Sequence, residues 1–183
     1  MKKVKMIAVA MVLILGSAAG ARATGWGVGA FGGATIPLAQ DDAARGTLYG
    51  AHLRLSVGGM LGIEPNFTYF KNGDWEIDDA PGETFEGSKF TAIGVNLILG
   101  GAGPVTGFRF FPFGGAKYYN EKNDFRDFSD SRLGWSAGLG LEIGAGSLGI
   151  DIRASGEVLP LDGGGSRKWA HIRGGLNYYF GIK

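Results

Sequence analysis

The chain has 183 residues, of which 45% are hydrophobic and 19% charged, a length typical of one domain and a composition too apolar for a disordered chain. It has no cysteine, which excludes disulfides, thiolate zinc sites, cysteine nucleophiles and a lipoprotein anchor. With two histidines it also lacks the composition of a multi-histidine metal cluster, and no cofactor is expected.

The first 23 residues have the layout of a secretory signal peptide. Three lysines lie in residues 1–5, an apolar run covers 6–15, and residues 21–23 read Ala-Arg-Ala. An uncleaved anchor is the alternative, but the apolar stretch is short for a membrane-spanning helix. We expect cleavage after Ala23, which leaves residues 24–183 as the mature domain with a net charge of about −3. That balance gives no support to a nucleic-acid partner.

After residue 24 the dominant hydrophobic period is two, which predicts β-strands whose two faces differ. In the sixth segment, for example, Leu133, Trp135 and Leu139 alternate with Gly134 and Ser136. A bend or bulge is expected in the fifth segment, at Pro112 and the glycine pair after it. Eight segments carry this pattern: 25–36, 49–57, 61–70, 89–99, 105–118, 133–143, 148–158 and 169–180.

The connections between these segments alternate in length. Long polar links are expected at 37–46, 71–87, 119–132 and 159–168, and short glycine-rich links at 58–60, 100–104 and 144–147. This alternation puts both chain ends on the side of the short turns. It predicts an all-β fold, an eight-stranded antiparallel up-and-down transmembrane β-barrel.

The two faces of the strands indicate which one meets lipid. The apolar face carries aromatic residues near strand ends, as expected of a face in contact with lipid, while the other face is rich in glycine, serine and a few balanced charges. Eight strands enclose an interior that side chains can fill, so we expect a lumen plugged by paired charges. Arg54 is expected opposite Glu64, and Glu142 opposite Asp151 or Arg153. The predicted lumen network comprises Arg54, Glu64, Arg109, Lys117, Glu142, Asp151, Arg153, Glu157 and Arg173.

The whole mature chain resembles the small outer-membrane β-barrel proteins of Gram-negative bacteria, of the OmpA-transmembrane-domain, OmpX and OmpW type. The resemblance rests on the leader, the eight alternating segments and the C-terminal run of Leu176, Tyr178 and Phe180. It implies a place in the cell outer membrane, surrounded by lipid and lipopolysaccharide. It also implies that the barrel-assembly machinery reads the last strand. The class includes adhesins, stability proteins, small pores and lipid-modifying enzymes, so it implies no single function.

Two of the long links carry candidate interaction residues. The link 71–87 is strongly acidic, which suits either a divalent cation, a basic partner or simply a solvated loop. Exposed aromatic residues in the next long link also suggest binding. The candidates for contact with an extracellular protein or surface ligand are Asp74, Trp75, Glu76, Asp78, Asp79, Phe125 and Phe128.

The histidines are the remaining candidates for chemistry. His52 and His171 fall on the predicted lumen face, where they form either a proton-sensitive or metal-binding pair or two separate hydrogen-bonded residues, the reading we favour. A lipid-modifying hydrolase would need a serine, a histidine and an acid in contact, for which Ser155, His171 and Glu157 are the available set. Because that set points into the lumen, away from acyl chains, no catalytic residue is expected.

The sequence therefore predicts a non-enzymatic outer-membrane barrel that stabilises the membrane or adheres through its extracellular loops. A narrow channel for small or apolar solutes is the alternative, and a lipid-modifying enzyme comes third. A soluble lipocalin-like barrel, with the two strand faces exchanged, is the main rival at the level of the fold.

Overall fold

A computed structural model describes residues 23–38, 44–76, 84–123 and 128–180. Within these ranges it has ten β-strands and no helix. No helix in the described part of the chain is long and apolar enough to cross a membrane. The strands are β1 (Ala23–Pro37), β2 (Ala44–Val57), β3 (Leu61–Gly73), β4 (Trp75–Glu76), β5 (Thr84–Phe85), β6 (Lys89–Leu99), β7 (Gly107–Asn123), β8 (Phe128–Ala145), β9 (Leu148–Pro160) and β10 (Ser166–Phe180).

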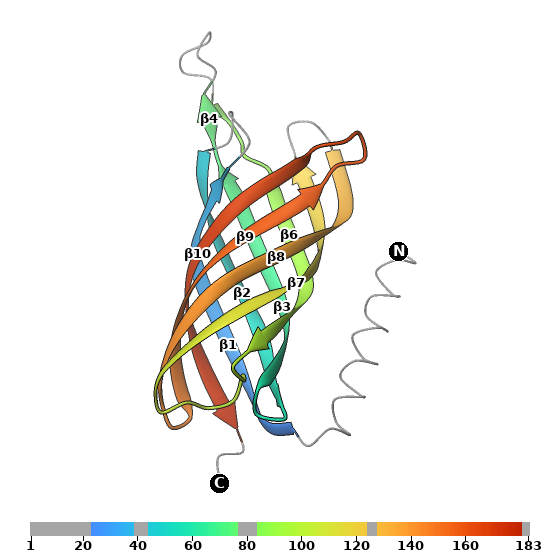
Figure 1. Cartoon of the computed structure of the whole chain (residues 1–183). Helices are drawn as coiled ribbons and strands as arrows, with labels where there is room; N and C mark the ends of the chain where they lie inside the picture. The colour runs from blue at the N-terminus through green and yellow to red at the C-terminus, as the bar shows by residue number, and fades with distance from the viewer. Residues whose placement is uncertain (1–22, 39–43, 77–83, 124–127, 181–183) are drawn as a thin grey trace.

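Eight of the strands close into a barrel in the order β1-β10-β9-β8-β7-β6-β3-β2, with every neighbouring pair antiparallel. The short strands β4 and β5 pair only with each other. Their hairpin stands above one rim, while β1 starts and β10 ends at the opposite rim, the one with the short turns (Figure 1). The predicted eight-stranded up-and-down barrel is confirmed.

One of the predicted long links is largely strand and another is strand in part. The described residues of 119–132 belong to the end of β7 or the start of β8, whereas 159–168 holds the end of β9 and the start of β10 with residues 161–165 between the two strands. Polar residues there suggested loops, but a strand that projects beyond the lipid meets water and can be polar while its backbone ladder continues. The ladder between β7 and β8 runs without a break from Gly107 to Asn123, so it contains no bulge at Pro112, while the ladder between β7 and β6 stops at Phe113, next to that proline.

The outward face of the barrel is apolar, the reverse of a soluble barrel. Along β9 the outward Leu148, Ile150 and Ile152 are all more than half exposed. The inward Asp151 and Arg153, which alternate with them, are each 1% exposed. The outward apolar stretch from Leu148 to Val158 covers about 24 Å of membrane depth, for about 3.4 Å per residue and a tilt of about 45°. That matches the apolar band of a membrane barrel.

Aromatic side chains mark the two ends of this band. Near the rim with the short turns, the Trp26 ring stacks on that of Phe180 with 4.0 Å between centroids. Toward the other rim, Tyr49 and Tyr69 lie side by side on β2 and β3, with centroids 5.0 Å apart. Aromatic residues at both interfaces are the usual arrangement in membrane barrels.

The core of the protein lies inside the barrel, in two apolar clusters with charged side chains between and around them. One cluster lies toward the rim of the β4–β5 hairpin, and we call it the aromatic layer: Phe31, Leu48, Phe70, Phe90, Ala92, Tyr119, Leu159 and Trp169. The other lies toward the short turns and consists of Ile98, Ala102, Phe111 and Phe113.

Candidate functional site

The lumen below the aromatic layer is filled by a network of charged side chains from several strands. Glu64 on β3 accepts four hydrogen bonds from three side chains of this network. Its carboxylate accepts from Arg54 Nε at 2.9 Å and from both terminal nitrogens of Arg153 at 2.7 Å. Asn96 on β6 donates a further hydrogen bond at 3.1 Å. A fully buried carboxylate is tolerated because every lone pair is engaged.

Arg54 extends the network to the far wall. Its guanidinium donates to Glu142 on β8 at 2.9 Å, to the Tyr179 hydroxyl at 2.6 Å and to Asp151 on β9. Arg109 reaches the same Glu142 from β7 and donates to the Gly103 carbonyl at 2.8 Å. We call Arg54, Glu64, Arg109, Glu142, Asp151 and Arg153 the charged layer. Its guanidinium groups also lie against phenylalanine rings, with Arg153 5.1 Å from the Phe111 centroid.

The partners expected from the sequence are present in part. Arg54 meets Glu64 as expected, and Glu142 lies opposite Asp151 in the register of β8 and β9, as expected. The hydrogen bonds differ from that register, because Glu142 binds Arg54 and Arg109, while Arg153 binds Glu64 and Asp151. Three neutral residues also belong to this network and were not expected from the sequence, because only charged residues were considered for it: Asn96, Asn177 and Tyr179. Their positions on the lumen side of the two-residue alternation were visible and could have revealed them.

A second, smaller ionic cluster lies next to the aromatic layer. Glu157 on β9 is bonded by Lys117 and by the Tyr119 hydroxyl, and its Oε1 lies 3.2 Å from His171 Nδ1. Above it, Trp169 packs edge-on against Phe90 with centroids 5.1 Å apart. Both oxygens of the Glu157 carboxylate are therefore bonded, and aromatic rings cover the cluster.

The catalytic set considered from the sequence is only half assembled. His171 contacts Glu157, but its other ring nitrogen has no hydrogen-bond partner among the described residues, so Ser155 is not bonded to it. His52 lies beside the charged layer instead, where its Nε2 is 2.8 Å from Asn177 Oδ1. The two histidines therefore serve different partners. No group of three or more metal-ligating side chains with site geometry occurs in the described ranges.

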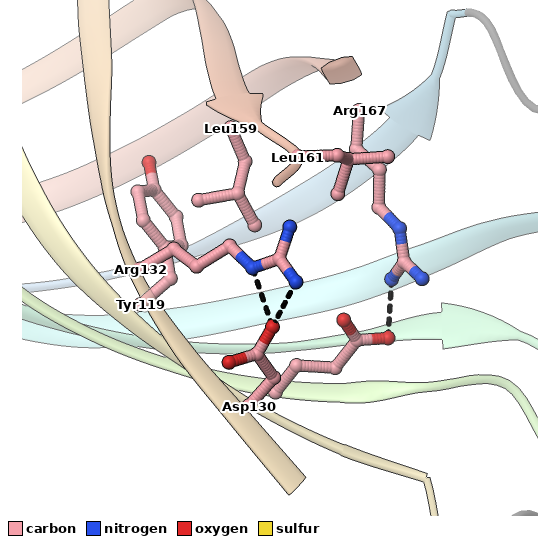
Figure 2. Close-up of a pocket in the computed structure, with 7 residues that line it drawn as sticks. Tyr119, Asp130, Arg132, Leu159, Leu161 and Arg167 are labelled. Atoms are coloured by element: carbon pink, nitrogen blue, oxygen red, sulfur yellow. Dashed lines mark hydrogen bonds and ion pairs between the residues drawn. The ribbon is translucent and has the colours of Figure 1, made fainter. Parts of the chain in front are cut away.

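The rim of the β4–β5 hairpin has its own ion pairs. Arg132 is paired with Asp130, and Arg167 with Glu121, around a small hollow also lined by Leu159 and Leu161 (Figure 2). The Arg167 guanidinium lies 5.8 Å from the centre of the Phe90 ring of the aromatic layer. The positive groups that surround this hollow are thus neutralised by their neighbours.

The base of the acidic segment 71–87 is organised by lysines. Asp74 accepts from the backbone N–H of Gly87 at 3.0 Å and lies 3.0 Å from Lys71 Nζ, and these two contacts lower its pKa. Glu86 pairs with Lys89 at 3.0 Å and with Lys71 at 3.2 Å, which lowers its pKa as well.

The other loop candidates are only partly described. Trp75 and Glu76 form β4, where their backbones pair with Phe85 and Thr84, and Phe128 opens β8. Asp78, Asp79 and Phe125 lie outside the described residues.

The C-terminal run closes the barrel. Leu176 and Tyr178 face outward, with 66% and 46% exposure, and Phe180 pairs with Trp26 on β1. The residues singled out at the C-terminus therefore form the seam at which the first and last strands join.

Known proteins share this architecture. The family model of the outer membrane protein β-barrel domain matches residues 6–180. The solved structure of Neisserial surface protein A is similar with a TM-score of 0.67 at 12% identity, covering 84% of this chain and 96% of that one. The N-terminal β-barrel domain of Pseudomonas aeruginosa OprF gives 0.56 at 15% identity, with 86% and 98% covered.

The Yersinia pestis outer membrane protein Ail, solved in a phospholipid bilayer nanodisc, gives a TM-score of 0.53 at 18% identity, with 85% of this chain and 99% of that one covered. None of the curated proteins matches the chain. At these identities the likeness to solved structures shows the fold.

Proposed function

The chain belongs to the outer membrane protein β-barrel domain family, and we propose that it is a non-enzymatic surface protein with a closed lumen. In this proposal the barrel is an anchor, and the rim that bears the β4–β5 hairpin either stabilises the outer membrane or adheres to an extracellular partner. Family membership implies the outer membrane as its location. In membrane barrels of this kind the longer connections face outward and the short turns face the periplasm.

The observation that carries the closed lumen is that side chains bridge opposite walls. In a ring of eight strands, β2 and β8 are four strands apart in either direction, and so are β3 and β9. Arg54 on β2 nevertheless bonds Glu142 on β8, and Arg153 on β9 bonds Glu64 on β3. Trp169 on β10 and Phe90 on β6, which are also four strands apart, meet across the lumen nearer the other rim. Three such bridges leave no straight aqueous path of the width of a porin channel.

The surface role is supported by a substructure outside the closed ladder, the only one in the described part of the chain. The β4–β5 hairpin stands above the rim (Figure 1). Its base is held by the contacts of Asp74 and Glu86 with Lys71 and Lys89. A barrel that served only to fill the membrane would need no such extension. We propose that this hairpin carries the contact surface, with Trp75 and Glu76 in its first strand.

The test is to replace residues 74–86 by a short Gly-Ser turn. The barrel should still fold, because the replaced segment contributes no strand to the closed ladder, and heat-modifiable migration on a gel checks that. We expect a loss of adhesion or a more permeable outer membrane in cells that carry the variant. A folded variant with unchanged adhesion and unchanged envelope permeability would contradict the surface role.

An enzymatic role has little support in the lumen. The Ser155 hydroxyl is not bonded to His171, and Glu157 is already neutralised by Lys117. Lipid A masses should therefore be identical in cells with and without the protein. A mass difference that Ser155→Ala abolishes would contradict this.

Two further parts of the proposal concern biogenesis. Residues 1–23 are proposed as a cleaved signal peptide, and N-terminal sequencing of the mature protein, expected to begin at Thr24, tests it. The strand that ends in Phe180 is proposed as the element that the barrel-assembly machinery reads. Phe180→Ala should then lower the amount of assembled barrel, whereas the outward but more distant Ile172→Ala should not.

A further inference from the structure

The charges inside the lumen do not balance. Five cationic side chains enter it against four carboxylates among the described residues, and the pair of Glu121 with Arg167 at the rim balances itself. Any protonation of His52 or His171 would only increase the positive excess. An uncompensated charge in a buried place is costly, and proteins avoid it by pairing or by binding a counter-ion. The five cations are Arg54, Arg109, Lys117, Arg153 and Arg173, and the four anions are Glu64, Glu142, Asp151 and Glu157.

The excess lies at Arg173 on β10. The other four cations each donate a hydrogen bond to a carboxylate. The nearest carboxylate oxygen to Arg173 is Glu64 Oε1 at 3.7 Å, which is too far for a hydrogen bond. That oxygen already accepts from Asn96 and from Arg153. Arg173 is 5% exposed, and its Nε has no partner in the described part of the protein.

The nearest aromatic ring to the Arg173 guanidinium does not engage its hydrogen-bond donors. Its central carbon lies 4.1 Å from the centre of the Phe31 ring, a cation–π contact. Such a contact engages the flat face of the guanidinium, whereas the N–H groups point outward in its plane. The Phe31 ring in turn stacks on the His52 ring at 5.7 Å between centroids. Arg173 is therefore held in place by a ring that supplies no hydrogen-bond acceptor.

Other buried polar side chains on the strands around Arg173 also lack hydrogen-bond partners among the described residues. Ten buried polar side-chain atoms in the described ranges lack a hydrogen-bond partner, and eight of them belong to β10, β1, β2 and β3, which are consecutive around the barrel. Buried polar groups are nearly always satisfied, so groups of this kind mark places where water or an ion is bound. The eight residues are Thr35, His52, Asn66, Thr68, Asn72, Trp169, His171 and Arg173.

We propose that this side of the lumen binds one small monovalent anion of the chloride class, with the free donor edge of Arg173 as its main ligand. A single negative charge matches the single positive excess. The anion is small because the charged layer and the aromatic layer fill the lumen on either side of it. Water molecules link it to the unpartnered groups of the neighbouring strands. The proposal concerns a ligand inside the barrel and is independent of the role of the β4–β5 hairpin.

The first test is the anion dependence of thermal unfolding. The purified full-length mature protein, folded in detergent, is heated at a fixed rate in sodium chloride or in sodium gluconate of equal ionic strength. A ligand that binds only the folded state stabilises it. We expect the unfolding midpoint to be several degrees higher in chloride and the effect to saturate as chloride replaces gluconate. No difference between the two salts would overturn the proposal.

Two variants separate a specific site from a general salt effect. Arg173→Met removes the excess charge and the donors, so its midpoint should no longer depend on chloride. Lys168→Met removes one positive charge from an exposed position on the same strand and should respond to chloride as the wild type does. An equal chloride response in Arg173→Met and the wild type would overturn the proposal.

A second measurement needs only the wild type, in case Arg173→Met fails to fold. Crystals equilibrated with sodium bromide should show an anomalous scattering peak at hydrogen-bond distance from the Arg173 guanidinium. Data of sufficient quality to show bromide elsewhere, without a peak at Arg173, would overturn the proposal.

Discussion

The charged layer and the aromatic layer occupy the same lumen but differ in their chemistry. In the charged layer each carboxylate accepts hydrogen bonds from more than one side chain. Glu64, for example, accepts from Arg54, Arg153 and Asn96. In the aromatic layer, Trp169 and Phe70 are fully buried and contact each other by ring packing. The first layer depends on every partner being present, because removing one leaves others unpaired. The second layer depends on how well its side chains fill the space, so removing one of them leaves a cavity but leaves no other group unpaired.

The largest effect should come from breaking the charged layer at Glu64, which bonds two arginines. Glu64→Ala removes one of the two carboxylates that Arg54 and Arg153 share, the other being Asp151, and we expect a loss of about 3–5 kcal/mol in the free energy of unfolding. Urea unfolding of the protein in lipid vesicles measures it. If the layer depends on shared carboxylates, the double variant Glu64→Leu, Arg153→Met should lose less free energy of unfolding than its two single variants lose together. Additive losses would contradict the sharing.

The aromatic layer should respond to volume alone. Trp169→Ala removes the largest of its fully buried side chains and should cost about 3–4 kcal/mol. Trp169→Phe keeps most of the ring contacts and should cost clearly less. An equal loss in the two variants would mean that the indole N–H, which has no partner among the described residues, is the important group. The same urea titration distinguishes the two outcomes.

A smaller effect is expected where a glycine makes room for a lumen ring. A Cβ at Gly140 would meet the Phe111 ring beneath the charged layer, so Gly140→Ala should cost about 1–3 kcal/mol. Gly156 on the outward face has nothing within contact distance of its Cβ position, which makes Gly156→Ala the matched control. The control should be neutral or slightly stabilising. Equal destabilisation of the two variants would show that the tight fit inside the lumen is not the cause.

The smallest effect concerns the base of the hairpin. The Gly87 N–H and Lys71 lower the pKa of Asp74 below that of the unfolded chain. The stabilising contact is therefore fully present above the unfolded pKa and is lost as the pH falls through the lower, folded value. The amide resonance of Gly87 should shift with a midpoint below the ordinary aspartate pKa, and Asp74→Asn should abolish that shift. A midpoint at or above the ordinary value would contradict the contact.

The sequence predicts well those features that follow from the two-residue period. Each strand position has a fixed face, so the entry of Arg54 and Arg153 into the lumen and the outward direction of Ile150 and Ile152 could be deduced without a structure. The pairing of Arg54 with Glu64 could also be deduced, because the two residues flank a short turn.

Other features depend on how the sheet closes. The stagger of the strands decides which levels of opposite walls meet, and no local pattern shows that Arg54 reaches Glu142 or that Arg153 reaches Glu64. The β4–β5 hairpin escaped prediction because two residues a strand are too few to show an alternation. The lengths of β7 and β8 were underestimated because their outer parts are polar on both faces.

The most direct test of a closed lumen is the conductance of the purified wild-type barrel in planar lipid bilayers. The bridges of Arg54 to Glu142 and of Arg153 to Glu64 predict insertion without discrete conductance steps over a wide range of voltages. The variant Arg54→Ala, Arg153→Ala, Trp169→Ala, which also cuts the bridge of Trp169 to Phe90, serves as the positive comparison and should show steps. Stable, stepwise conductance of the wild type would contradict the account, because ions would then pass through the barrel while the bridges are intact.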